Sequence, residues 1–188
     1  EYVDLSGENI ESLIKRFTLS TAEVEDIIYK GKEVQGVIIA EIKSVENHPN
    51  SKKLHLLKVD TGSGIVDCVC GAPNVEVGQR VAFAPVGSHV VGMEITEATV
   101  AGYVSQGMCC GEDELGISDD HTGLMVIDSD APLGTDIKSI YAIDDIIFEV
   151  DNKSLTNRPD LWGHYGIARE LAALAGRELK PLELGDLS

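Results

Sequence analysis

The sequence predicts an α+β protein in which a β module interrupts a small αβ domain. Short apolar segments that alternate with polar residues, separated by turn residues, fill the middle of the chain. Amphipathic helical segments lie near both ends, at residues 8–17 and 160–175, and neither end is large enough to fold alone. We therefore expect residues 1–37 and 151–188 to form one domain, interrupted by a β domain of residues 38–150.

The first helix is expected at residues 8–17, followed by a strand at 22–28. The apolar residues of the helix recur at i, i+3, i+4 and i+7, which places them on one face: Ile10, Leu13, Ile14 and Phe17. Ser6 is the expected N-cap, because its hydroxyl can accept a bond from a free backbone N–H. The strand leads into a turn at Lys30-Gly31-Lys32.

The strand Ile65–Cys70 is the centre of the expected β module. Its side chains alternate between two faces, and Gly71 and Pro73 end it in a shaped loop. Further strands are expected at 34–45, 54–60, 80–84, 90–95, 97–100, 124–127 and 146–150. A short helix is expected at 112–116, where acidic residues suit the helix dipole. Short strands at this spacing predict a closed or sandwich-like module.

The last helix is expected from Asp160 to Ala175. Pro159 holds its entry, Asp160 is the expected N-cap, and Gly176 is the expected terminator. Its apolar face matches that of the first helix, so the two should pack together and complete the end domain.

Composition and charge restrict the partners. The formal net charge is −17, and residues 39–150 hold six Lys and Arg against 18 Asp and Glu. Because phosphate neutralisation supplies most nucleic-acid affinity, an RNA site here must be a local patch and weak on its own. No apolar run approaches the roughly 18 residues that a membrane span needs. We expect neither a membrane nor DNA as a partner.

The start of the chain and its cysteines bear on its completeness and on its cellular compartment. It begins with Glu1, so we expect a fragment of a longer protein. No signal peptide is visible, which favours the reducing cytoplasm. Four cysteines lack the spacing of zinc knuckles, and reduced thiols packed in a β core are favoured over a metal site: Cys68, Cys70, Cys109 and Cys110.

No catalytic set stands out in the sequence. The phosphate-binding loop, the His-Glu-x-x-His motif and the Gly-x-Ser-x-Gly motif are absent from it. His164 could act as a base, but a partly exposed helical histidine is the favoured interpretation. We expect no catalytic residue and no metal ligand in this chain.

The loop that begins at His48 is the strongest binding candidate. It offers His48, Asn50, Lys52 and Lys53, and such side chains at one edge of a β barrel can meet phosphates and base edges. A solvated turn explains the same composition equally well. None of the nine aromatic residues lies in this loop, so base stacking is poorly supplied.

Several motifs follow one another along the chain: His48–Leu54, Cys70–Asn74, Ser105–Cys109 and Glu114–Ile117. In this order they resemble the tRNA-binding OB-fold module of aminoacyl-tRNA synthetases and related tRNA-binding proteins. The flanking motifs Thr156–Asp160 and Gly166–Leu174 resemble, more specifically, the β subunit of bacterial phenylalanyl-tRNA synthetase. In that family this last helix completes an N-terminal domain that the OB module interrupts.

The resemblance implies a five-stranded OB-fold barrel and a non-catalytic role for this chain. The whole enzyme would be an α2β2 ligase that uses ATP and Mg²⁺ to attach phenylalanine to tRNA(Phe), with its catalytic centre in the α subunit. The barrel would be an auxiliary tRNA contact or a structural element, without a cofactor of its own. Candidate RNA-binding residues are His48, Asn50, Lys52, Lys53, Asn74, Arg80 and Ser105.

Two departures from the family weaken the expected grip on tRNA. Thr99-Val100-Ala101-Gly102 carries no positive charge where the family has a Lys-Leu-Arg-Gly-like run, and Cys110-Gly111 replaces a serine after Cys109. Two alternatives therefore stay open. One is a free-standing tRNA-binding module, and the other is an OB fold that binds proteins and has no RNA affinity.

Overall fold

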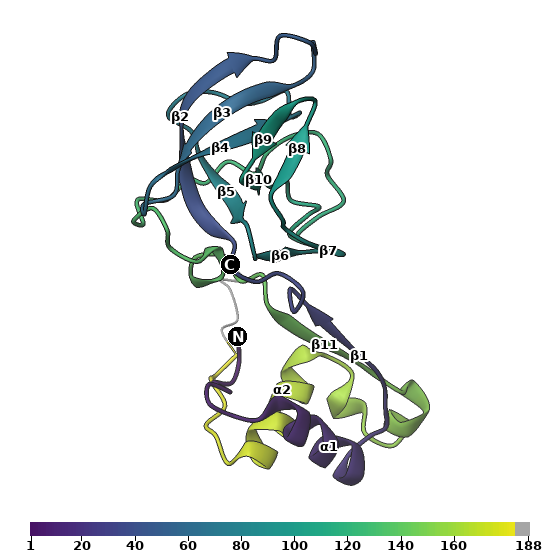
Figure 1. Ribbon diagram of the computed structural model, residues 1–188. Helices are drawn as coiled ribbons and strands as arrows, with labels where there is room; N and C mark the ends of the chain where they lie inside the picture. Colours follow the sequence, from purple (N-terminus) through teal and green to yellow (C-terminus); the bar gives the residue numbers. More distant parts are fainter. Residues whose placement is uncertain (183–188) are drawn as a thin grey trace, which may run out of the picture. The chain divides into compact units, whose positions relative to one another are not determined.

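The computed structural model describes residues 1–182, which divide into two compact units (Figure 1). Residues 29–145 form one unit, called here the barrel unit. Residues 1–28 join those from 146 onwards in the other, called here the helical unit. The chain crosses from one unit to the other in β1 (Val24–Lys30) and returns in β11 (Asp145–Val150), and these two strands pair in a two-stranded sheet.

The barrel unit contains five longer strands and two small hairpins. The longer strands are β2 (Ile38–Asn47), β3 (His55–Asp60), β4 (Ile65–Cys70), β5 (Arg80–Pro85) and β10 (Gly107–Cys109). The hairpins pair β6 (His89–Val90) with β7 (Met93–Glu94) and β8 (Ala98–Val100) with β9 (Tyr103–Ser105). A 3-10 turn, η1 (Ile137–Ser139), precedes β11.

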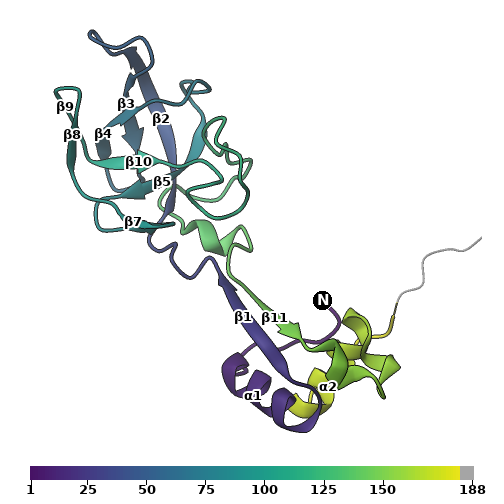
Figure 2. The same cartoon turned by 90° about the vertical axis from the view of Figure 1, so that its right-hand side faces the viewer.

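The five strands form one antiparallel sheet in the order β10-β5-β2-β3-β4. A bulge between Ile42 and Ser44 interrupts the β2–β3 register, and bulges bend and twist a strand. The outer strands β4 and β10 contact each other, so the sheet curls into a nearly closed barrel (Figure 2). The expected α+β class with a five-stranded OB-like barrel is confirmed.

Strand β5 is buried on both faces and separates two apolar clusters. Val81 and Phe83 point into the barrel interior, where Leu57 and Cys68 also lie. Ala82 and Ala84 point the other way, into a second cluster that includes Cys110. Alternation along a strand accounts for this division, because successive side chains leave on opposite faces.

Three expected elements of the barrel unit are absent from residues 1–182. Residues 90–95 form no single strand, because Val91 and Gly92 make the turn of the β6–β7 hairpin. Residues 124–127 form no strand, and only a single bridge joins Val126 to Val81. Residues 112–116 form a turn rather than a helix, because the Glu114 carboxylate accepts the Gly111 N–H and closes the turn locally. The segment between Gly111 and Gly116 is also too short to repay helix nucleation.

The helical unit begins with α1 (Ile10–Ser20), whose buried residues include Leu13 and Phe17. The expected N-cap was wrong. The Asn9 side chain accepts the Ser12 N–H at 2.8 Å, whereas the Ser6 hydroxyl is bonded to Asp4. The helix therefore starts two residues later than expected and gains a turn at its end.

The last helix is shorter than expected. Residues 160 and 161 belong to a 3-10 turn, η3 (Pro159–Leu161), which follows η2 (Asn152–Leu155), and α2 (His164–Ala175) begins only after Gly163. Asp160 is thus not its N-cap. Gly176 ends α2 in the left-handed conformation, with φ 67°, as expected.

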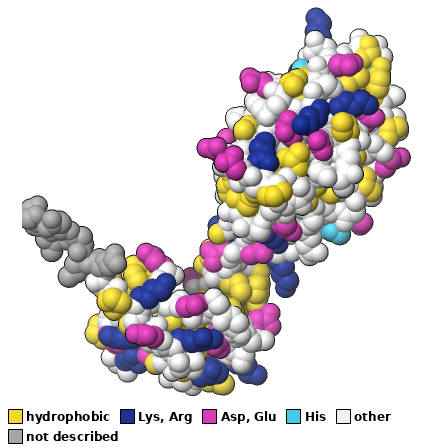
Figure 3. Space-filling view, turned by 90° about the vertical axis from the view of Figure 1, so that its left-hand side faces the viewer, with side chains coloured by type: hydrophobic (Ala, Val, Ile, Leu, Met, Phe, Trp, Pro, Cys, Tyr) yellow, Lys and Arg dark blue, Asp and Glu magenta, His cyan; other side chains and the backbone are white. Residues whose placement is uncertain are grey.

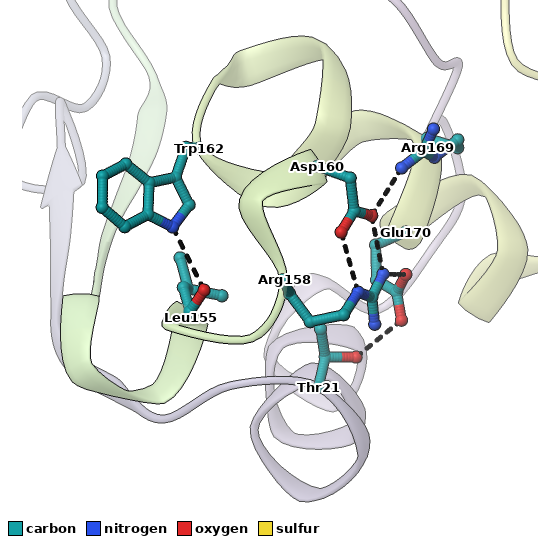
Figure 4. A network of polar contacts seen from close by, with 7 residues as sticks. All are labelled: Thr21, Leu155, Arg158, Asp160, Trp162, Arg169 and Glu170. Carbon is teal, nitrogen blue, oxygen red and sulfur yellow. Dashed lines mark hydrogen bonds and ion pairs between the residues drawn. The ribbon is translucent and has the colours of Figure 1, made fainter.

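The Asp160 carboxylate belongs to an ion-pair network, and Gly163 occupies the N-cap position of α2 (Figure 4). The Arg158 guanidinium donates to both carboxylate oxygens of Asp160 at 3.0 Å, and Arg169 donates to one of them at 2.6 Å. Arg158 also reaches Glu170 at 3.1 Å, and Glu170 accepts from the Thr21 hydroxyl at 2.8 Å. The bond from Arg158 holds the pKa of Asp160 below its usual range. The network thus links the first and last segments of the helical unit.

Within residues 1–182, no helix reaches the length and apolarity required to cross a membrane.

Because β1 and β11 pair with each other, we expect the helical unit to fold without the barrel. Replacing residues 31–144 by a short glycine–serine linker should leave a helical, cooperatively melting domain, measured by circular dichroism. The Phe17→Ala variant of the excised form provides the control, since loss of this fully buried side chain should cost about 3–5 kcal/mol and abolish the transition. An excised form that shows no cooperative melting would contradict the two-segment domain.

Candidate nucleic-acid interface

The loop between β2 and β3, residues 48–54, is folded around the His48 ring. The ring is 3% exposed, and its Nδ1 accepts the Asn50 N–H at 3.1 Å. Because Nδ1 is an acceptor, Nε2 carries the proton and donates to the carbonyl oxygen of Ala101 at 3.2 Å. His48 is therefore an internal anchor of the loop rather than an exposed contact.

The Ala101 carbonyl belongs to the turn of the β8–β9 hairpin. Ala101 and Gly102 both have positive φ, at 50° and 93°, as the tight turn of a two-residue hairpin requires. The Tyr103 ring lies edge-on to the His48 ring, with centroids 5.0 Å apart, and is 39% exposed. The structure thus brings an aromatic residue to the loop that lacks one of its own.

A groove of about 310 Å³ lies beside this contact, lined by residues of β2, β3, β4 and β9. Its lining includes Tyr103 and Val104 together with Lys58 and Asp67, whose charged groups are 2.5 Å apart. Strands 2 and 3 of an OB barrel and the loops after strands 1 and 4 make up its usual oligonucleotide surface. In this chain those parts are β3, β4, the loop 48–54 and the β8–β9 hairpin.

The basic side chains of residues 38–150 differ in what they contact. Lys43 pairs with Glu41 at 2.8 Å, Lys58 pairs with Asp67, and Lys138 pairs with Asp144 at 2.7 Å. Arg80 donates to the backbone carbonyls of Ser129 and Ala131. Lys52 and Lys53 are exposed, and neither ammonium group makes an ion pair or hydrogen bond with residues 1–182.

Among the six Lys and Arg side chains of residues 38–150, all of them described, these two lysines are thus the ones without an ion pair or hydrogen bond. On the barrel face in the upper part of Figure 3, Lys and Arg side chains are interspersed with Asp and Glu instead of forming a broad basic surface. A pair of unpaired cations on one loop matches the local patch that the net charge requires.

The other three candidate residues use their polar groups inside the barrel unit. Asn74 donates to the Leu124 carbonyl at 3.0 Å and accepts the Leu124 N–H at 2.8 Å. The Ser105 hydroxyl, on a residue 5% exposed, accepts the Val69 N–H at 3.0 Å and donates to the Gly107 carbonyl at 2.8 Å. With Arg80, these residues hold loops in place, and any contact of theirs with RNA stays a prediction.

Sequence reasoning missed Tyr103, which has no neighbouring motif that marks it as part of a site. The sequence feature closest to it is the Ala101-Gly102 turn. This turn predicts a hairpin, but it does not predict that the hairpin packs against His48. Residues 1–182 contain no group of three or more His, Cys, Asp or Glu side chains placed to hold a metal ion.

Comparison with known proteins identifies similar chains. Residues 37–136 match the family model described as "Putative tRNA binding domain". Phenylalanine–tRNA ligase beta subunits are similar over most of the chain. The beta subunit of Leptospira interrogans is 39% identical over 92% of the chain, and that of Aromatoleum aromaticum is 42% identical over 89% of the chain. The beta subunit of Chromobacterium violaceum is 41% identical over 94% of the chain. The chain spans only 21–22% of the length of these relatives.

Ser105 should contribute to stability, because its hydroxyl satisfies a backbone N–H of β4. The Ser105→Ala variant leaves the half-buried Val69 N–H without this acceptor, and we expect a loss of about 1–3 kcal/mol in the free energy of unfolding. Urea denaturation followed by circular dichroism measures this loss. Ser63→Ala, on an exposed turn, is the matched control and should change stability by less than about 0.5 kcal/mol. Equal effects of the two substitutions would contradict the role assigned to Ser105.

Proposed function

The chain belongs to the tRNA-binding domain family, and from this premise we propose that it is the N-terminal, non-catalytic part of a phenylalanine–tRNA ligase β subunit. One observation carries the proposal: similarity to the ligase β subunits covers 92% of the chain, whereas the tRNA-binding domain accounts for residues 37–136. A barrel shared with other tRNA-binding proteins would explain a match to the barrel alone. It leaves the match to the helical unit unexplained.

The whole enzyme would attach phenylalanine to tRNA(Phe) with ATP, together with an α subunit. We place the Mg²⁺ ion and the catalytic residues of that reaction outside this chain, so its contribution would be made through binding. An α2β2 assembly and a cytoplasmic location follow from the same proposal.

Within the β subunit, we propose that the loop 48–54 contacts tRNA weakly. Lys52 and Lys53 would approach phosphates, Asn50 would offer an amide to a base edge or sugar, and Tyr103 would offer a ring face to an unstacked base. The groove beside Tyr103 is partly acidic, so phosphates should stay at the loop and should not enter the groove.

The alternatives predict different behaviour. A free-standing tRNA-binding module needs only the barrel, and the helical unit would have no use in it. A protein-binding OB fold draws support from the 18 acidic residues among residues 39–150, but it does not account for two unpaired lysines on the usual oligonucleotide surface.

Aminoacylation tests the assignment to the ligase. The complete β chain that contains this segment, mixed with its α subunit, ATP and Mg²⁺, should charge tRNA(Phe) with phenylalanine, measured with labelled amino acid. Without the α subunit there should be no charging. Absence of charging by the complete mixture would remove the ligase assignment and would leave the free-standing module as the better proposal.

Binding of tRNA tests the loop separately. In the fragment, Lys52→Glu with Lys53→Glu should abolish binding at low salt and, where residual binding is measurable, reduce the salt slope by about 2, one for each lost phosphate contact. The control Lys15→Glu with Lys153→Glu makes the same change in net charge outside the barrel and should bind nearly as the original chain does. Equal losses in both double variants would show that only overall charge matters.

A further inference from the structure

Three of the four cysteines gather where the barrel closes. The outer strands β4 and β10 meet there, and Cys68 and Cys109 face each other across the junction with their sulfur atoms 4.0 Å apart. Cys70 lies on the same face of β4 as Cys68, in the same apolar cluster as Cys109, and it shares a cavity lining with Cys109. All four cysteines of the chain are free thiols. The junction thus holds two thiols of one strand against a third of the other.

Cys70 is the member of this group that solvent can approach. It is 8% exposed, against 6% for Cys109 and 1% for Cys68, and it lies in the wall of an open cavity of about 470 Å³ beside Ala72 and Met108. Its sulfur accepts the Ala72 N–H at 3.4 Å, which favours a negative charge on the sulfur. Cys109 lines the same cavity.

The hydrogen bonds divide the protons among the thiols. The bond from Cys109 lowers the pKa of Cys70 to about 7. The pKa of Cys109 is raised well above its usual range, because its proton is held by bonds to Cys68 and Cys70 and because it is buried. The pKa of Cys68 is lowered as well by its bond with Cys109, but Cys68 does not line the cavity. A thiolate is the reactive form of cysteine, so the cavity position makes Cys70 the nucleophile and Cys109 the neighbouring thiol.

We propose that Cys70 and Cys109 are a peroxide-reactive dithiol that closes the barrel junction with a disulfide. The Cys70 thiolate attacks one oxygen of a hydroperoxide, the O–O bond breaks, and Cys70 becomes a sulfenic acid while hydroxide or alkoxide leaves. The Cys109 sulfur then attacks the Cys70 sulfur, and the sulfenic oxygen leaves as water with the Cys109 proton. Two thiols lose two electrons, and the peroxide is reduced.

Cys110 provides an internal comparison. It follows Cys109 directly, but it points to the opposite face of the sheet and lies in the other apolar cluster. It is fully buried, and burial raises the pKa of its thiol. Its thiol donates to the Met108 carbonyl at 3.6 Å. A reaction that depends on the junction should leave Cys110 untouched.

The proposal rests on the barrel itself and does not depend on the proposed function. Its effect would still reach the candidate interface, since β10 follows β9 directly and β9 carries Tyr103. A disulfide would join β4 to β10 and restrict the segment that holds the hairpin against the loop 48–54.

The test treats the reduced chain of 188 residues with hydrogen peroxide, blocks the remaining thiols by alkylation, and digests the protein with trypsin. Cleavage after Lys58, Arg80 and Lys138 separates Cys70 from Cys109, so mass spectrometry should find peptides 59–80 and 81–138 joined. Fragmentation should place the bond at Cys70 and Cys109. In the Cys109→Ser variant dimedone should label Cys70, because the sulfenic acid has no thiol to resolve it.

Cysteine variants distinguish a reaction specific to Cys70 and Cys109 from non-specific oxidation of all four thiols. Cys70→Ser should slow peroxide consumption at least about tenfold, whereas Cys110→Ser should react as the original chain does. Four free thiols after peroxide treatment, a bond at Cys68 or Cys110, or an unchanged rate in Cys70→Ser would each overturn the proposal. Circular dichroism checks the fold of each variant. Short-time dimedone labelling of the unsubstituted chain gives the same answer if a variant does not fold.

Discussion

The closure of the barrel between β4 and β10 is the constraint on which the rest of the barrel unit depends. These strands are the two edges of the sheet, and edge strands leave backbone groups without ladder partners. Residues just before β10 supply the missing partners. The Gln106 N–H donates to the Asp67 carbonyl at 2.8 Å, and the Ser105 hydroxyl accepts the Val69 N–H. These bonds hold β9 against β4, and in doing so they place Tyr103 beside His48.

Charge acts on the same unit in a different way. Three of the six Lys and Arg side chains of residues 38–150 are neutralised by a neighbouring carboxylate, so they add little to the field at a distance. Lys52 and Lys53 lie on a loop whose backbone is folded around His48, and their ammonium groups remain free for a partner. Thus an overall negative charge and a local cationic site are compatible, because ion pairing and not composition decides which lysines are available.

Much of the fold followed from alternation and turn residues, and the errors have local physical causes. Strand β4 ends at Cys70 as expected, and Gly176 ends α2. Asp160 was expected to cap a helix, but its carboxylate pairs instead with Arg158, two residues before it, and with Arg169, nine residues after it. Only one of the two parts of the candidate site could be predicted, because the other depends on a contact between distant residues. The loop 48–54 is visible in the sequence, whereas the hairpin carbonyl that His48 binds is 53 residues away.

Strand β4 connects the cysteine group with the hairpin that carries Tyr103, because its side chains contact Cys109 and its backbone binds the segment before β10. Cys68 and Cys70 point into the barrel toward Cys109, while the backbone groups of Asp67 and Val69 hold the segment before β10. Asp67 and Val69 also line the groove beside Tyr103. A change in the thiols therefore acts on the same strand that positions the hairpin. The thiol chemistry and the interface are coupled through β4, because Cys68 lines the groove beside Tyr103 and Val69 lines both the groove and the cavity of Cys70.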